Sequence, residues 1–242
     1  MSPHKKVLIT GATSGIGEAL MYKYSNENYD VIACGRQSEK LSALYSTKQA
    51  SQTLQFDITD GQQIEDAAAK VCDIDIIIFN AGDCRYIDDV MAFNAQLFAD
   101  IINTNLIALG YLVKHFLPKL KQGGQLVFIS SSATLMPFPR SEAYGASKAG
   151  VDYLANSLRL DLKIHDIGVT LVHPGFIKTP LTDKNDFAMP FMLSAKEAAH
   201  LIFHGVKSKK IYLHFPKRLT LLLKLFRLLP NRVWQALVIK DS

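Results

Sequence analysis

Three side chains that could together move a proton and polarise a carbonyl group follow one another along the sequence. Ser131 is followed thirteen residues later by Tyr144, and Lys148 comes four residues after that. The pKa of a free tyrosine lies near 10, so exchanging protons near neutrality requires about 4 kcal/mol of stabilisation of its ionised form. A lysine and a second positive charge could supply it, while a serine hydroxyl hydrogen-bonds the substrate oxygen. The three residues therefore indicate carbonyl or alcohol chemistry.

A helix and a strand must bring these residues together. Apolar spacing predicts a helix over 142–161, which places Tyr144 and Lys148 on one face. Ser131 follows an apolar strand at 125–129, and the ends of parallel strands are where open sheets bind ligands. A tyrosine four residues before a lysine is expected about once by chance in this chain, so other motifs must support the interpretation of Tyr144 and Lys148 as a catalytic pair.

A glycine-rich turn near the N-terminus gives that support. An apolar strand at 6–10 runs into Gly11, Gly15 and Gly17, and an amphipathic helix follows through about Asn26. Gly11 allows a tight turn, Gly15 lets the backbone approach a pyrophosphate, and Gly17 permits close helix packing. The sequence therefore predicts that a dinucleotide is held by Gly11, Thr13, Ser14, Gly15, Ile16 and Gly17.

With both motifs in this order, the chain resembles the single-domain form of the short-chain dehydrogenase/reductase family over nearly its whole length. The matching positions are 10–17, Asp57, Asn80-Ala81-Gly82, Asn105, Ser131, Tyr144, Lys148, Pro174-Gly175 and Thr179. The resemblance implies that Tyr144 is the general acid or base and that Lys148 lowers its pKa and holds the nicotinamide ribose. It also implies that Ser131 orients the substrate and that Asn105 supports a proton-relay water, with Asn103 as the alternative to Asn105.

The resemblance implies further cofactor contacts at strand ends. Asp57 would contact the adenine, although it could instead cap the following helix. Asn80, Ala81 and Gly82 would lie beside the adenosine ribose unless they form an ordinary turn. The carboxamide and phosphates would be held by Pro174, Gly175, Ile177 and Thr179, for which a plain loop is the alternative.

Charge at the end of the second strand bears on cofactor choice. A carboxylate there binds the ribose hydroxyls of NAD and repels the extra phosphate of NADP. This chain has Gly35 and then Arg36, which suits a phosphate, while Ser14 adds no second charge. We expect NADP(H) to be preferred, with NAD(H) as the alternative cofactor and a solvated surface arginine as the alternative explanation.

Strand-like apolar runs alternate with helical patterns, at residues 6–10, 30–34, 53–57, 74–79, 125–130, 168–173 and 210–214. Seven alternations predict an α/β fold of the Rossmann type, a doubly wound, seven-stranded parallel sheet with helices on both faces. The chain has 242 residues, 48% of them hydrophobic, and no low-complexity linker, so we expect one NAD(P)-binding domain over 1–242.

Composition excludes several classes of protein. Three scattered cysteines are too few for a disulfide framework or a thiolate zinc site, so no metal is expected. No apolar signal region or run of about 18 apolar residues is present, which favours a cytoplasmic location. Positive and negative charges upstream of residue 217 are equal in number, and no recognised nucleic-acid-binding motif is present, so nucleic-acid binding is not expected.

The C-terminal segment is basic and apolar. From residue 217 to 242 there are six basic residues and one acid, so this segment carries the whole net charge of +5. A helical segment at about 216–239 would place Lys217, Thr220, Lys224 and Arg227 on one polar stripe, with leucines over the remainder. It either packs over the substrate cleft or a subunit partner, or it binds an anionic membrane surface peripherally.

The substrate is not defined by the sequence. Residues 180–193 include Phe187, Met189, Phe191 and Met192. With Phe138 and Phe176 they suggest a short lid over an apolar aldehyde or ketone, unless they are core. The glycine usual in the family shortly after the serine is absent, with Thr134 and Leu135 in that region. The local shape of the cleft should therefore differ from the family's.

The leading hypothesis is an NADP(H)-dependent oxidoreductase that transfers a hydride between the nicotinamide and a carbonyl or alcohol, with Tyr144 moving the proton. A non-catalytic dinucleotide sensor is the alternative, but binding alone does not require both Ser131 and Tyr144. A third hypothesis, nucleotide-sugar epimerisation, uses the same tyrosine and lysine chemistry. It is less favoured because such enzymes usually have a larger C-terminal substrate domain than the residues after Thr179 provide. The resemblance also implies a homodimer or homotetramer formed through helices at about 92–118 and 143–165.

Overall fold

The computed structural model describes residues 4–239, and its main feature is a parallel sheet of seven strands in the order β3-β2-β1-β4-β5-β6-β9. The strands are β1 (Lys6–Thr10), β2 (Asp30–Gly35), β3 (Gln52–Gln55), β4 (Ile74–Phe79), β5 (Leu120–Ile129), β6 (Gly168–Pro174) and β9 (Tyr212–Phe215). They form where aliphatic residues run together; Val7, Leu8 and Ile9 of β1 are fully buried on both faces of the sheet. The predicted Rossmann-type sheet is confirmed.

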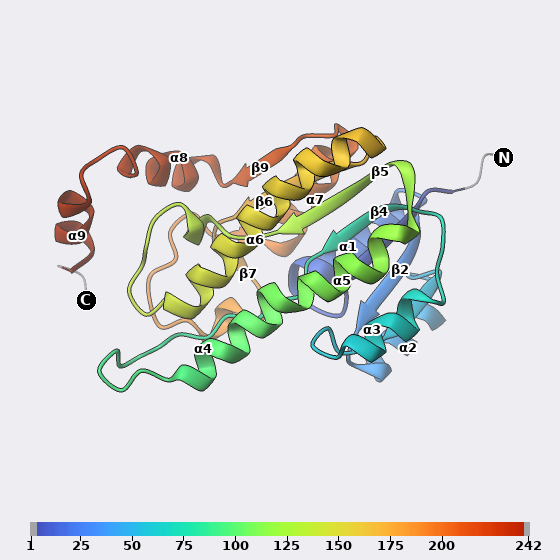
Figure 1. Ribbon diagram of the computed structural model, residues 1–242, viewed down its shortest axis with the longest axis horizontal. Coiled ribbons are helices and arrows are strands. Elements are labelled where there is room, and N and C mark those ends of the chain that lie inside the picture. The colour runs from blue at the N-terminus through green and yellow to red at the C-terminus, as the bar shows by residue number, and fades with distance from the viewer. Residues whose placement is uncertain (1–3, 240–242) are drawn as a thin grey trace.

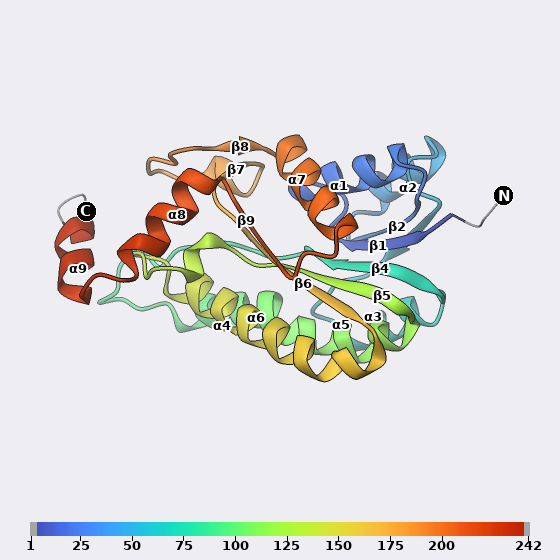
Figure 2. The same ribbon diagram turned by 90° about the horizontal axis from the view of Figure 1, so that it is seen from above.

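Helices cover both faces of this sheet (Figure 2). One face packs against α1 (Gly15–Asn26), α2 (Ser38–Ser46) and α7 (Ala195–Lys207). The other packs against α3 (Gly61–Ala68), α5 (Ala108–Phe116) and α6 (Glu142–Asp161), with α4 (Ala95–Ile102) beside α6. Each face therefore has its own apolar core, and the carboxyl ends of the strands are left to bind ligands.

Side-chain caps fix where two of these helices begin. Ser194 and Glu197 form the capping box expected for α7, in which each side chain bonds the backbone of the other residue. Asp60 caps α3 by accepting hydrogen bonds from the N–H groups of Gln62 and Gln63. Asp57 is therefore not the helix cap.

A continuous helical run, Ala95–Lys119, joins α4 and α5 through a π-helical turn at Asn103–Ile107. By length and composition alone this run could cross a membrane, a test that core helices of globular proteins also pass. Its residues Leu109, Leu112 and Phe116 are buried in the core against the sheet. The π turn widens the helix by one residue where Asn105 points inward.

Short elements link the main strands and helices. β7 (Ile177–Lys178) pairs in parallel with β8 (Leu193–Ser194), and single turns of 3-10 helix lie at 117–119, 132–134, 162–165 and 182–184. After β9 come α8 (Lys217–Phe226) and α9 (Asn231–Ile239), which lie at the end of the molecule opposite the N-terminus (Figure 1). Lys240 and Asp241, counted in the basic segment, lie outside the described residues.

Candidate active site

The glycine turn after β1 is tightly packed. Gly11 and Gly15 have φ angles of +67° and +57°, which side chains disfavour. A Cβ atom at Gly17 would lie 2.1 Å from the carbonyl oxygen of Gly11, and one at Gly15 would lie 3.2 Å from Thr179 Cγ2. The first turn of α1 therefore lies close against the strand end, as predicted for Gly17.

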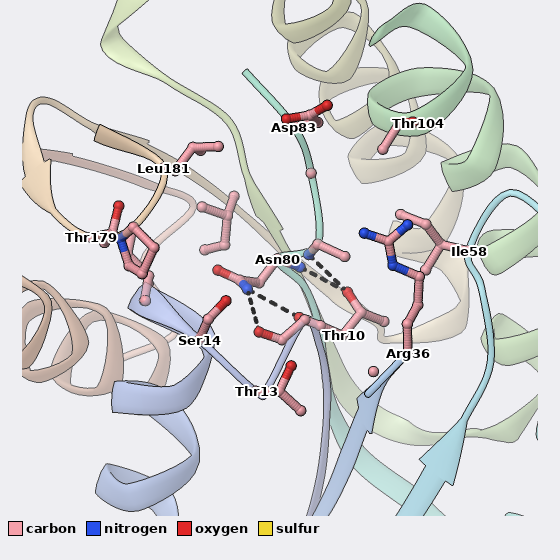
Figure 3. A pocket seen from close by; sticks show the side chains of 18 of the residues that line it. Thr10, Thr13, Ser14, Arg36, Ile58, Asn80, Asp83, Thr104, Thr179 and Leu181 are labelled. Atoms are coloured by element: carbon pink, nitrogen blue, oxygen red, sulfur yellow. Dashed lines mark hydrogen bonds between the residues drawn. The ribbon is translucent and has the colours of Figure 1, made fainter. Parts of the chain in front are cut away.

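Hydrogen bonds join the ends of β1 and β4 (Figure 3). Thr10 Oγ1 accepts from the N–H groups of Asn80 (3.0 Å) and Ala81 (3.1 Å), and Asn80 Nδ2 donates to the carbonyl oxygen of Thr10 (3.0 Å). The Asn80 side chain thus fixes the turn, which leaves the Asn80-Ala81-Gly82 backbone at the cleft.

A cleft of about 870 Å³ runs along the carboxyl ends of the strands. It is lined by nearly all the predicted site residues: Gly11, Thr13, Ser14, Gly15, Ile16, Arg36, Asp57, Asn80, Ala81, Gly82, Ser131, Tyr144, Lys148, Pro174, Gly175, Ile177 and Thr179. Gly17 and Asn105 do not line it. Figure 3 shows Arg36 and Thr179 on opposite sides of the joined turns, so the cleft extends past both.

The end of β2 carries a cation paired with an acid. Arg36 Nη1 lies 3.4 Å from Asp57 Oδ2 across the cleft rim. Burial raises the pKa of Asp57, but hydrogen bonds from Thr59 and the charge of Arg36 outweigh it and hold that pKa below its ordinary value. Lys40 of α2 lines the same region. It is a second cation, which the sequence analysis missed although it lies only four residues after Arg36.

Ser131, Tyr144 and Lys148 meet at the other part of the cleft. The hydroxyl of Ser131 lies close enough to the phenol of Tyr144 for its hydrogen bonding to lower the phenol's pKa. Lys148 is buried, its Nζ donates to the carbonyl oxygen of Ile129 (2.9 Å), and it lies 5.9 Å from the Tyr144 ring centroid. Burial raises the pKa of Tyr144, which the bond to Ser131 lowers only in part, and burial lowers the pKa of Lys148 to about 8. In the protein by itself, the lysine therefore does not bring the phenol's pKa below its ordinary value.

Asn105 is buried behind this group. Its Oδ1 accepts from the N–H of Asp83 (2.8 Å), and its Nδ2 donates to the Asp83 carbonyl oxygen (2.8 Å) and to Ser147 Oγ (2.9 Å). The side chain thus ties the π turn to α6 and to the loop after β4. Asn103, the alternative, does line the cleft.

A buried polar chain that the sequence analysis missed lies behind Lys148. Asp152 Oδ1 accepts from Ser130 Oγ and lies 2.9 Å from His173 Nε2, while His173 Nδ1 lies 3.0 Å from the Tyr212 hydroxyl. The positive charge of Lys148 is favoured by Asp152, one helical turn later on α6. The sequence marks His173 and Tyr212 only as polar side chains in or beside apolar strands, and it marks Asp152 only as one of several acids on a helix.

Apolar side chains flank the Ser131 and Tyr144 end of the cleft. Leu135 and Met136, in the region that lacks the usual glycine, pack with Leu219 and Leu223 of α8, and this substrate-side cluster also includes Phe138, Phe176, Phe226 and Trp234. Trp234 Nε1 donates to the carbonyl oxygen of Pro137 (2.7 Å). Of the predicted lid, Phe187, Phe191 and Met192 are all exposed, and Phe187 also contacts the rings of Tyr86 and Phe176. The C-terminal helices thus cover this end.

The cleft fits a dinucleotide. Ser14 makes no side-chain cap on α1, so the first N–H groups of that helix remain free to bind a phosphate. The positive φ angles and close approaches at Gly11 and Gly15 leave backbone rather than side chains facing the cleft. Together with the hydroxyl, phenol and ammonium groups at its other end, the site defines an NAD(P)-dependent oxidoreductase.

Comparison with known proteins agrees with this class. The model of the short chain dehydrogenase family matches residues 5–189. Serine 3-dehydrogenase of Agrobacterium fabrum is 36% identical over 182 residues, 73% of each chain. An NADP-dependent 3-hydroxy acid dehydrogenase of Escherichia coli is 31% identical over 178 residues, 71% of this chain and 72% of that one. A short chain dehydrogenase structure from Burkholderia cenocepacia, in complex with NADP, has a TM-score of 0.86 over 97% of both chains at 22% identity.

The chain therefore belongs to the short-chain dehydrogenase/reductase family, and it is an oxidoreductase that acts on CH–OH groups with NAD(P).

Proposed function

We propose that this protein prefers NADP(H) and interconverts a carbonyl compound and its alcohol, with Tyr144 as the general acid or base. The observation that carries the proposal is that Ser131, Tyr144 and the buried Lys148 all line the same cleft. The nicotinamide would supply or accept the hydride when bound. Ser131 would donate to the substrate oxygen, and Tyr144 would give that oxygen a proton or remove one.

The charges of the site support this role. With a pKa of about 8, Lys148 is mostly protonated at pH 7, so it can hold ribose hydroxyls and favour the ionised phenol. Because burial raises the pKa of Tyr144, the phenol carries its proton near neutrality, as a general acid must in the reductive direction. In the oxidative direction, the positive charge of an oxidised nicotinamide would favour ionisation of the phenol.

Preference for NADP(H) is supported by Arg36 and Lys40, two cations at the end of the cleft where β2 ends. No acidic residue follows β2 directly, since its last residue, Gly35, is followed by Arg36. The Escherichia coli relative is named as NADP-dependent. NAD(H) remains the alternative cofactor.

An apolar substrate is supported by the apolar cluster that contains Met136, Phe138 and Phe176 and packs beside the catalytic end, although none of these three side chains lines the cleft itself. Arg140, which lies over the Tyr86 ring nearby, is paired with Asp88 (2.6 Å) and Asp186 (2.8 Å), so its charge is already neutralised. A small hydroxy acid is the second candidate, because two relatives are named for serine and 3-hydroxy acids and Lys184 lines the cleft.

The test is NADPH consumption with a panel of apolar aldehydes and ketones beside 3-oxo acids, for the wild type and Tyr144→Phe. Loss of the phenolic proton should lower turnover by about 10²- to 10⁴-fold. NADPH binding should stay within about threefold, since Phe keeps the ring packing. Tyr153→Phe is the matched control, because Tyr153 is exposed on the same helix. Tight NADPH binding without turnover on any substrate would favour the sensor alternative instead.

We also propose a cytoplasmic homodimer or homotetramer. The outer sides of α5 and α6 and of the turns beside them carry exposed apolar residues, namely Ile107, Tyr111, Tyr153, Leu160 and Ile164. Such a surface along two neighbouring helices suits a subunit interface. The free cysteines Cys34, Cys72 and Cys84 suit a reducing compartment.

A further inference from the structure

Helix α8 is apolar on two sides, one of which faces away from the protein. Leu219 and Leu223 are buried in the substrate-side cluster. Leu221 and Leu225, one turn apart on the other side, are 57% and 58% exposed. The exposed side continues through the turn into α9, and we call it the C-terminal apolar surface: Leu221, Leu222, Leu225, Leu228, Leu229, Val233 and Leu237. A run of large exposed side chains of this kind marks an interaction site.

The same segment is strongly basic. It contains Lys217, Arg218, Lys224, Arg227 and Arg232, and the sequence from 217 to 239 has no acidic residue. Burial lowers the pKa of Lys217, and the neighbouring Lys224 and Lys210 lower it further, which shows a positive potential around the start of α8. An occupant of this surface must therefore be apolar and negatively charged.

A second copy of the chain does not meet that requirement. In a twofold dimer the same patch contacts itself, so the exposed Arg218, Arg227 and Arg232 would meet the same three cations of the other copy, with no acid in the segment to pair them. An apolar helical face bordered by lysines and arginines instead suits the boundary between head groups and acyl chains of an anionic bilayer. We propose that the C-terminal apolar surface docks this protein peripherally onto an anionic membrane surface.

Docking in this way fixes the orientation of the protein. Both views place α8 and α9 at the end away from the N-terminus, so they can approach a plane without interference from α1 and α2 (Figures 1 and 2). The inner side of α8 packs on Leu135 and Met136 beside the catalytic residues. If the proposed function holds, the substrate end of the cleft would face the lipid, which suits an apolar carbonyl compound dissolved in the membrane.

The test is co-sedimentation of the whole protein with vesicles of phosphatidylcholine containing about 30% phosphatidylserine, at low ionic strength. Leu225→Glu/Leu228→Glu should reduce binding at least tenfold. The control Tyr45→Glu/Ile211→Glu makes the same charge change at exposed residues on other surfaces and should leave binding unchanged. Arg218→Gln/Arg227→Gln should bind about tenfold more weakly to anionic vesicles. NADPH affinity, measured for each variant, establishes that the fold is intact.

Binding to anionic but not neutral vesicles, weakened by salt and by the two surface variants, would support the proposal. Failure of a protein that binds NADPH to sediment with anionic vesicles would overturn it. So would equal binding by wild type and Leu225→Glu/Leu228→Glu, or a decrease in oligomer size caused by that variant, which would mean that another copy covers the surface. None of these readouts depends on turnover, so the proposed reaction is tested separately.

Discussion

Replacing Arg36 by alanine should weaken NADPH binding selectively. Arg36 is 75% exposed and lies 3.4 Å from Asp57. An exposed ion pair of this kind contributes less than about 1 kcal/mol, so its loss should hardly affect folding. A charge-assisted contact with a phosphate contributes about 1.5–3 kcal/mol. Because Arg36 must also leave or share Asp57 to make that contact, the net loss should be about 1–2 kcal/mol, or about 5- to 30-fold in NADPH affinity.

The assay is fluorescence titration of NADPH and NADH at one fixed ionic strength, since salt screens such contacts. NADH lacks the extra phosphate, so Arg36→Ala should change its affinity by less than about twofold. Arg85→Ala is the matched control, because Arg85 lines the cleft elsewhere and is paired with Asp83 and Asp100. It should leave the ratio of the two affinities unchanged.

Asp57→Asn examines the same pair from the other side. It keeps the side-chain oxygen that accepts from Thr59 but removes the charge that competes for Arg36. Loss of a carboxylate several ångströms from the phosphate should strengthen NADPH binding about threefold. An Arg36→Ala variant that binds both cofactors with the wild-type affinity ratio would refute this account of cofactor choice.

Three further predictions concern stability. Gly17→Ala would place a Cβ 2.1 Å from a backbone oxygen. It should lower the free energy of unfolding, measured by chemical denaturation, by about 1–3 kcal/mol. The control Gly110→Ala should leave the free energy of unfolding unchanged, because a Cβ at Gly110 would meet open space. Because the pKa of Lys148 is lowered from 10.5 to about 8, the unfolded chain holds that proton longer, so the free energy of unfolding should rise by about 3 kcal/mol between pH 8 and 10.5. Lys148→Met should lack this rise in pH-dependent denaturation. Burial and the charges of Lys217 and Lys224 lower the pKa of His214 to about 4. The contribution of neutral His214 to the free energy of unfolding is therefore complete above pH 6.5 and is lost as the pH falls towards 4. The protection factors of the α8 amides, that is, their exchange rates corrected for the intrinsic pH dependence of exchange, should therefore be lower at pH 5 than at pH 7, and His214→Gln should reduce this difference.

The fold was predictable because its signals are local. Buried parallel strands appear in the sequence as uninterrupted apolar runs, and Ile76, Ile77 and Ile78 of β4 are such a run. The glycine turn and the helix carrying Tyr144 and Lys148 have their own short-range patterns. The strand order itself follows from the family resemblance rather than from any of these patterns.

Features that depend on tertiary contacts were not predictable. Arg36 and Asp57 are 21 residues apart, and nothing in the sequence pairs them. Thr220 was expected on a polar stripe but is fully buried, where its hydroxyl bonds the Pro216 carbonyl oxygen and lies 2.7 Å from His214 Nδ1. A buried hydroxyl is tolerated when its hydrogen bonds are satisfied locally, which a polar-versus-apolar pattern does not register.

Gly175 connects the cofactor loop to the C-terminal helices. Its N–H donates to the Phe215 carbonyl oxygen (2.7 Å), and a Cβ added to it would lie 2.7 Å from Leu219 Cδ2 of α8. A movement of this loop on cofactor binding would therefore act first on Phe215 and on the Leu219 side chain of α8. Thermodynamic linkage then requires reciprocity: a ligand of α8 that changes cofactor affinity by some factor has its own affinity changed by that factor when the cofactor binds. In that case the affinity of the cleft for the cofactor would depend on whether α8 has a ligand bound, and the affinity of α8 for its ligand would depend on the cofactor.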